Sequence, residues 1–470
     1  MTEKAEAAAE AGESRGRFSS KLGFVLAAAG SAVGLGNVWK FPYIAGENGG
    51  GLFVLIYLGC VLVVGLPVMI AEVLIGRRAQ RSPAGAFQFV AGEQTAWRLV
   101  GWMGVVAGFV ILSYYSVVAG WTLNYAFMGI NRFFVGKDAE QIATAFGTLY
   151  GAGDINVFWH LVFMITTVGI VIGGVQRGIE AWSRVLMPAL LVMMAALVVH
   201  AMFQPGFGRA LSFLFAPHSD KLTAAGILEA LGHSFFTLSL GMGAMLTYGS
   251  YLSKERDLVA SSALVSVLDT VVALMACLVL FPVIFSIGLE PSAGPGLVFK
   301  SMPLALTQMR GGVVLIIVFF ALLFFAALTS AISLLEVVAS TVIDQLGWPR
   351  RRAVLLCGAA VFLFGLPSAL SGSGAVFGKW SALFGKNFFD SMDYLASNWL
   401  LPLGGLFMAL FVGWAMPDRA RREEFQRGSK FGRFYGVWLF SLRFVVPIAV
   451  LAVWLFSVEI LPKAWLTGGK

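Results

Sequence analysis

The residues best suited to chemistry form two glycine-rich stretches, each inside a long apolar run. They are residues 30–37 (GSAVGLGN) and residues 237–243 (TLSLGMG). Glycine costs about 1 kcal/mol per residue inside a helix relative to alanine, so clustered glycines beside hydroxyl and amide side chains predict locally unwound backbone. Unwound backbone at membrane depth must be buried in protein or line a cavity, because lipid cannot satisfy its hydrogen bonds.

Backbone groups freed in this way could bind small charged species. Carbonyl oxygens suit hard cations such as sodium, and the amides at a helix N-terminus favour an anionic group. Either stretch alone is equally compatible with close helix packing. The pairing favours a binding site, because the stretches fall in the first and sixth predicted spans. Interrupted helices at matching positions of two halves are typical of transporters built from an inverted repeat.

A deeply placed acid and a pair of hydroxyl residues are further candidates. Asp269 lies in the apolar run LDTVVA at residues 268–273. An acid at such depth is costly and is a functional candidate by default. Thr329 and Ser330 are adjacent in another apolar run, where such a pair often bonds back to its own helix.

The composition requires a membrane environment for these candidates. Of 470 residues, 58% are hydrophobic and 12% are charged, whereas soluble domains are about half apolar and a quarter charged. The net charge of +8 comes from Lys and Arg in short clusters between apolar runs, which is the pattern of membrane orientation and not of nucleic-acid binding. We find no nucleophile–base pair and no set of metal-ligand residues, which argues against an enzyme.

The elements that must position these residues are transmembrane helices, each needing about 20 apolar residues. We predict an all-α integral membrane protein with about eleven spans, near residues 22–47, 52–76, 97–130, 157–175, 182–203, 225–251, 259–289, 311–342, 353–370, 393–416 and 434–460. Residues 1–20 would form a flexible cytoplasmic tail, residues 21–203 and 225–416 two five-helix repeats, and residues 434–460 the eleventh helix.

Charge placement predicts the orientation of the spans. Basic clusters occur at residues 15–21, 77–81, 177–184, 254–256, 350–352 and 419–433. They fall in every second connection, and cytoplasmic loops are enriched in Lys and Arg. This predicts a multi-pass protein of the cell (inner or plasma) membrane, with its N-terminus in the cytoplasm and its C-terminus outside.

The first interrupted helix also carries a family resemblance. Residues 30–42 (GSAVGLGNVWKFP), followed by residues 47–51 (ENGGG), resemble the first-helix signature of the neurotransmitter:sodium symporters, in the bacterial amino-acid branch typified by the leucine transporter. Further matches run through nearly the whole chain, at residues 114–115, 177–180, 234–243, 324–330 and 390–393. The resemblance implies sodium-coupled symport of an amino acid into the cell by alternating access, in an eleven-helix variant.

The resemblance implies two sodium sites. The first would use the carbonyls of Gly30, Val33 and Ala326 and the hydroxyls of Thr329 and Ser330. The second would use the Ala32 carbonyl and the side chains of Asn37, Thr237 and Asp269. Where this chain has Asp269, the family commonly has asparagine, with a nearby acid or a chloride site one turn later, at Ala273. We therefore expect Asp269 to supply the negative charge and transport to be independent of chloride.

The resemblance places the substrate between the two interruptions. The lining would be Ser31, Ala32, Leu35, Gly36, Ile111, Tyr115, Phe236, Thr237, Ser239, Met242, Ser330 and Leu334. The amides of Leu35 and Gly36 and the hydroxyl of Tyr115 would bind the carboxylate. The mostly apolar lining predicts an apolar or aromatic L-amino acid, and the adaptable Met242 favours a roomier pocket. Monoamine-carrying members have an acid where this chain has Gly34, which argues against dopamine-like substrates.

Two ion pairs would gate this site. Lys40 would meet Asp393 on the outside, more loosely than the family's usual arginine because lysine cannot form a bidentate fork. Arg15 would meet Asp344 on the inside, with Phe18 packed beneath them.

Gly178 and Pro188 match a motif with which some relatives unwind the fifth helix, and proline breaks a backbone bond there. Two alternatives remain open at this stage. Asp269 could carry a proton, since a carboxyl group in a low dielectric readily takes one, which would give proton-coupled amino-acid transport. The chain could also be a membrane sensor that binds an amino acid without moving it. The sequence predicts no oligomeric state.

Overall fold

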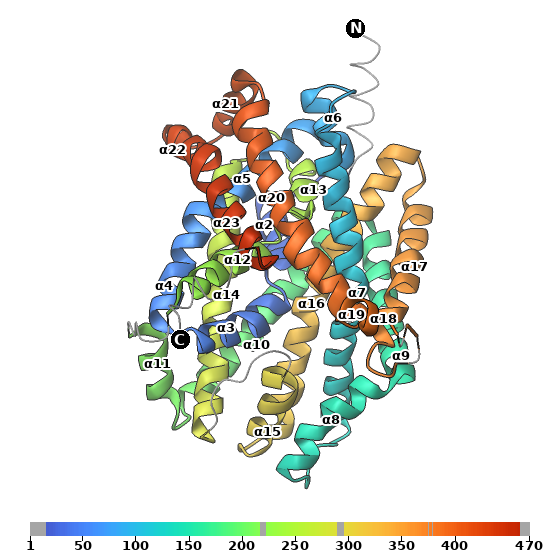
Figure 1. Cartoon of the computed structure of the whole chain (residues 1–470), viewed down its shortest axis with the longest axis vertical. Coiled ribbons are helices and arrows are strands. Elements are labelled where there is room, and N and C mark those ends of the chain that lie inside the picture. The colour runs from blue at the N-terminus through green and yellow to red at the C-terminus, as the bar shows by residue number, and fades with distance from the viewer. Residues whose placement is uncertain (1–15, 217–221, 289–295, 375, 378, 461–470) are drawn as a thin grey trace.

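The computed structural model describes residues 16–216, 222–288, 296–374, 376–377 and 379–460. These residues form helices and connecting turns, with no strand among them. The helices run mostly along the long axis of the molecule (Figure 1). The predicted all-helical fold is therefore confirmed for the described part of the chain.

Nine helical segments of the described chain are long and apolar enough to cross a membrane. They are Gly51–Ala79 (α4, η2 and α5), Arg98–Ile130 (α7), Gly153–Ile172 (α9), Val175–Met202 (η3 and α10), Leu258–Ser286 (α14), Gly312–Leu346 (α16), Arg350–Ala369 (α17), Trp380–Ala415 (α18 to η6) and Gly432–Ser457 (η7 to α23). Shorter helices lie between them: α6 (Pro83–Ala91), α8 (Ala139–Gly151), α11 (Phe207–Phe215), η4 (Leu297–Ser301), α15 (Met302–Thr307) and α21 (Asp418–Gln426).

Both predicted helix interruptions are confirmed. The first lies between α2 (Lys21–Ala32) and the segment Gly36–Glu47 (η1 and α3), which are bent by 51°. The second lies between α12 (Ala224–Thr237) and α13 (Ala244–Ser250). Neither α12 nor α13 alone reaches the length of a span, so the total of about eleven spans remains a prediction.

The second interruption depends on residues in left-handed backbone conformations. Ser239, Gly241 and Gly243 have φ values of 54°, 80° and 74°, a region that glycine enters without steric cost. At Gly241 a Cβ atom would also lie 2.4 Å from the Leu401 carbonyl oxygen. The sequence TLSLGMG therefore turns the chain here where a helix cannot continue.

The two longest helices, α7 and α16, pack against each other. Large apolar side chains such as Leu62, Val192 and Ile448 are exposed on outer helices, as expected for surfaces facing lipid. Helix α2, which leads into the first interruption, packs against α10, α14 and α16.

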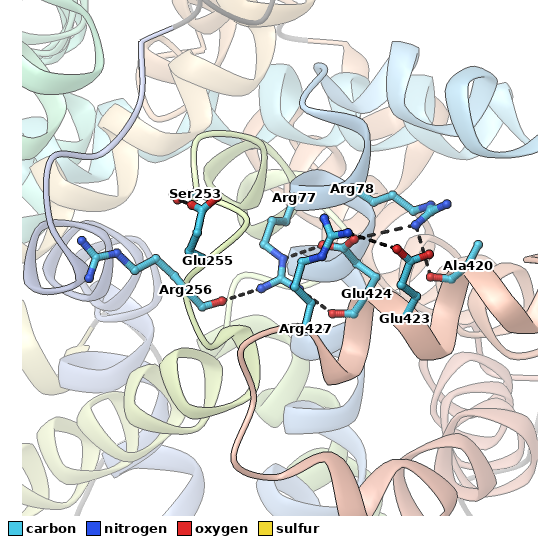
Figure 2. Close-up of polar contacts among 9 residues, drawn as sticks. All are labelled: Arg77, Arg78, Ser253, Glu255, Arg256, Ala420, Glu423, Glu424 and Arg427. Carbon is cyan, nitrogen blue, oxygen red and sulfur yellow. Dashed lines mark hydrogen bonds and ion pairs between the residues drawn. The ribbon is translucent and has the colours of Figure 1, made fainter. Parts of the chain in front are cut away.

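A buried ion pair fastens the segment between the last two spans to the core (Figure 2). Arg77, near the end of α5 (Leu66–Ala79), donates from Nε to Glu424 Oε1 over 2.6 Å. It also donates to the backbone carbonyl of Arg256 over 2.5 Å. Arg77 and Glu424 are 0% and 1% exposed. This cluster joins α5, the loop after α13 and α21.

Replacing Glu424 with alanine is expected to destabilise the fold by about 3–5 kcal/mol, because it leaves the Arg77 charge buried and unpaired. Glu423→Ala is the matched control, since Glu423 pairs with Arg427 at the surface and such pairs contribute about 1 kcal/mol or less. Thermal unfolding in detergent measures the difference. Equal midpoints for the two variants would show that the buried pair adds nothing.

Candidate ion and substrate site

Asp269 is the point at which both interruptions meet. It lies on α14, is fully buried, and accepts a hydrogen bond from Asn37 Nδ2 over 2.7 Å. Thr237 Oγ1 lies 3.1 Å from each carboxylate oxygen. Asn37 Oδ1 in turn accepts from the Gly34 amide over 2.9 Å. The acid and the two polar side chains predicted for the second sodium site therefore form one cluster.

The charge of this cluster is not balanced by a basic side chain. No ion pair to Asp269 occurs among the described residues, whereas the buried acids Glu180, Glu336 and Glu424 each meet an arginine; the buried Glu72 also has no basic partner there. A buried carboxylate without a countercharge is costly unless a cation or proton compensates it. The cluster can therefore hold a small monovalent cation among oxygen atoms, or a proton.

The second group of oxygen atoms lies where α2 ends against α16. Ser330 Oγ lies 3.5 Å from the Gly30 carbonyl oxygen, 3.1 Å from that of Ser31 and 3.3 Å from that of Ala326. Thr329 Oγ1 lies 3.0 Å from the Ala326 carbonyl. Val33 is also buried. Its carbonyl is the one of the three predicted for the first sodium site that accepts no hydrogen bond from Thr329 or Ser330.

The approach of these helices depends on Gly30, where a Cβ atom would lie 3.1 Å from the Thr329 Cβ. Thr329 and Ser330 both donate to the Ala326 carbonyl of their own helix, as the residues alone predicted. Ser330 additionally reaches across to α2, which the residues alone did not indicate.

A small cavity of about 30 Å³ separates the two interruptions. Its lining is Ser31, Ala32, Gly34, Leu35, Gly36, Asn37, Ile111, Tyr115, Phe236, Thr237, Ser239, Met242, Ser330 and Leu334. Every residue predicted for the substrate pocket is in this lining. Gly34 and Asn37 are additional, and their positions in the first glycine-rich stretch were the available signal. The volume holds about one water molecule, so the lining must move apart to admit an amino acid.

The groups predicted to bind a carboxylate are in contact with each other. The Leu35 amide donates to the Tyr115 hydroxyl over 3.3 Å. Ser239 Oγ donates to the Ser31 carbonyl over 2.8 Å, which joins the two interruptions directly. Ser31 Oγ donates to Ser333 Oγ over 2.7 Å. Ser333 was not predicted, although it follows Ser330 by about one helical turn.

On one side of this cavity lies a larger one of about 250 Å³, lined in part by Lys40, His233 and Phe236. The predicted ion pair between Lys40 and Asp393 is absent from the described structure. Lys40 Nζ instead lies 4.8 Å from the centre of the Phe236 ring, a cation–π contact. Asp393 accepts from Ser397 Oγ over 3.1 Å. No sequence pattern pointed to His233.

On the opposite side, the predicted inner pair is only partly described. Arg15 lies outside the described residues. Asp344 Oδ2 accepts from the Ser82 amide over 2.6 Å. Phe18 makes edge contacts with the rings of Tyr248 and Tyr251 at 5.7 and 6.3 Å, so it closes this side beneath α13.

The start of α2 is anchored beside the predicted unwinding motif. Glu180 accepts from the Ser19 amide over 2.8 Å and from Ser19 Oγ over 2.6 Å, and Arg184 also donates to it over 2.6 Å. Gly178 lies in the π-helical turn η3 (Val175–Glu180), and Pro188 lies inside α10 (Ala181–Met202). The unwinding itself remains a prediction.

Replacing Glu180 with alanine is expected to loosen the start of α2, because both hydrogen bonds to Ser19 are lost. Hydrogen exchange at the amides of residues 19–24 should accelerate at least about 5-fold, since two hydrogen bonds contribute about 1 kcal/mol each. Arg177→Ala is the control, because Arg177 is exposed in the same turn and takes no part in the two Ser19 bonds. Unchanged exchange in Glu180→Ala would contradict the proposed anchor.

Two further buried acids have partners near the site. Glu72 Oε1 accepts from the Gly241 amide over 2.7 Å, which stabilises the second interruption. Glu336 pairs with Arg350 over 2.5 Å and accepts from the Tyr251 hydroxyl over 2.5 Å. Both acids support the helices around the site.

Comparison with known proteins finds relatives along nearly the whole chain. Residues 15–141 and 140–466 match the family model described as the sodium:neurotransmitter symporter family. The chain is 39% identical over 448 residues to the uncharacterized sodium-dependent transporter YhdH of Bacillus subtilis (strain 168), covering 95% of this chain and 98% of that protein. It is 34% identical to an uncharacterized sodium-dependent transporter of Haemophilus influenzae, with 94% and 98% covered.

A solved structure is similar in sequence and in fold. The crystal structure of MhsT in complex with L-phenylalanine superposes with a TM-score of 0.86 at 43% identity, covering 94% of this chain and 100% of that chain.

Proposed function

Because the chain belongs to the sodium:neurotransmitter symporter family, we propose that it uses a sodium gradient to carry an apolar or aromatic L-amino acid into the cell. As a member of that family it is a multi-pass membrane transporter and not an enzyme. We further propose that residues 21–203 and 225–416 are two inverted five-helix repeats that alternate access to the site, with the N-terminus cytoplasmic.

One observation carries this proposal. Asn37 and Thr237, one at each interruption, bind the same buried acid, Asp269. A sodium ion at Asp269 would draw both interruptions together, and the substrate cavity lies between them. Ion binding would thereby order the site for the amino acid. The second proposed sodium ion, at Thr329 and Ser330, would fix α2 against α16.

The substrate class follows from the lining. Ile111, Phe236, Met242 and Leu334 supply apolar surface, while Tyr115 and the Leu35 amide can turn from each other to a carboxylate. The related MhsT binds L-phenylalanine in its crystal structure, which supports an aromatic substrate. Chloride independence is proposed because Asp269 already brings a negative charge, while Ala273 one turn later brings no polar group.

A thermal-shift screen of the purified protein with each of the twenty amino acids, in sodium and in potassium, tests the proposal. Ligands stabilise the state that they bind. We expect stabilisation by apolar and aromatic L-amino acids in sodium only, unchanged when gluconate replaces chloride. Stabilisation that needs chloride would refute the proposed role of Asp269, and stabilisation that is equal in potassium would refute sodium coupling.

A further inference from the structure

Arg443 is a charged residue inside an apolar span. It lies in the π-helical turn η8 (Ser441–Val445), within the span Gly432–Ser457. Among the described residues no acid lies within ion-pair distance of it. Charged residues in spans are costly and usually have a partner. The function proposed above gives Arg443 no role.

The side chain of Arg443 is held in place instead of extending freely toward water. Its Nε donates to the Gly413 carbonyl over 2.8 Å, and its Cζ lies 5.1 Å from the centre of the Trp414 ring. Gly413 permits this approach, because a Cβ atom there would lie 3.3 Å from the Arg443 Cγ. One edge of the guanidinium is therefore fixed against η6 (Phe411–Ala415).

The other edge of the guanidinium remains available. Its two terminal nitrogens make no hydrogen bond to the described residues, and Arg443 is partly exposed. The surrounding rings face outward, with Trp414, Phe440 and Phe444 exposed by 57%, 59% and 46%. Such exposed apolar rings are expected to face lipid. A fixed fork of N–H groups binds a phosphate with two parallel hydrogen bonds.

The position of Arg443 and Trp414 along the membrane normal fits contact with a lipid headgroup and not with an acyl chain. Trp414 lies one residue before the end of its span at Ala415, and the connection 416–431 that follows contains the exposed basic residues Arg422, Arg427 and Lys430. Aromatic residues concentrate at the level of the headgroups, and basic segments attract anionic lipid. We propose that Arg443 and Trp414 form a binding site for the phosphate of an anionic phospholipid.

Thermal unfolding of the detergent-purified protein with added phosphatidylglycerol, phosphatidylcholine or glycerol phosphate tests this proposal. We expect phosphatidylglycerol to raise the unfolding midpoint most. Arg443→Gln should lose at least half of that increase, and Arg443→Lys should lose part of it, because lysine keeps the charge without the fork. Arg351→Gln, which removes an exposed arginine at the start of α17, should retain it.

Each remaining outcome counts against the site. An equal increase with phosphatidylcholine would mean that the lipid charge is not recognised. An equal increase with glycerol phosphate would mean that a soluble anion is the ligand. An undiminished increase in Arg443→Gln would exclude Arg443 as the binding residue, and Arg443→Lys provides the same test if the glutamine variant does not fold.

Discussion

Replacing Asp269 with asparagine is expected to raise the sodium concentration for half-maximal uptake roughly 100-fold or more. The variant keeps the size of the side chain and removes its charge. Losing the partner of a buried charge costs about 3 kcal/mol or more, and about 1.4 kcal/mol corresponds to a factor of ten in binding. The hydrogen bonds from Asn37 and Thr237 cannot replace that charge, because both donors are neutral.

Asp257→Asn is the matched control on the same helix. Asp257 caps the start of α14 and accepts from the Ala260 amide over 3.0 Å, and asparagine caps helices equally well. Sodium-dependent uptake of a labelled amino acid should therefore be unchanged in this variant. If Asp269→Asn also kept the sodium dependence of the original protein, Asp269 would not be an ion ligand.

Gly34→Ala is expected to reduce amino-acid uptake by about 10- to 100-fold while the protein still folds. The added Cβ would lie 2.8 Å from Ser330 Oγ and 3.1 Å from the Tyr115 hydroxyl oxygen. Both atoms belong to the groups that we assign to ion and substrate binding. Overpacking of this kind costs about 1–3 kcal/mol. The cost would reduce substrate binding, because the added methyl group lies where the substrate carboxylate must fit.

Gly59→Ala is the control for this substitution, because nothing lies within 4 Å of a Cβ atom added at Gly59. Uptake and the thermal unfolding midpoint are measured for both variants. Uptake in Gly34→Ala that equals that of Gly59→Ala would show that residue 34 does not border the bound substrate.

The interruptions and the site lining could be predicted because their signals are local. The glycines of residues 30–37 and 237–243 disfavour a helix wherever they occur, and the order of the motifs carried the family resemblance. The fifth span was placed at residues 182–203, but it begins at Val175. The polar residues at 176–180 resembled a loop, whereas Glu180 and Gln176 are satisfied by contacts with the segment before α2.

Contacts between distant segments that the family resemblance does not cover could not be predicted. Arg77 and Glu424 are separated by 347 positions, and their pairing depends on how α21 folds back onto α5. The same holds for Lys40, whose contact with Phe236 depends on the angle between η1 and α12. A charged residue within an apolar run indicates a buried charge, but its partner is determined by the fold.

We propose that oxygen atoms at the two helix interruptions couple the binding of a sodium ion to that of an amino acid. Uptake of labelled L-phenylalanine into proteoliposomes tests it most directly. We expect accumulation above equilibrium under an inward sodium gradient and none when potassium replaces sodium. Accumulation driven by a pH gradient in sodium-free vesicles would contradict it, because Asp269 would then carry a proton and not bind sodium.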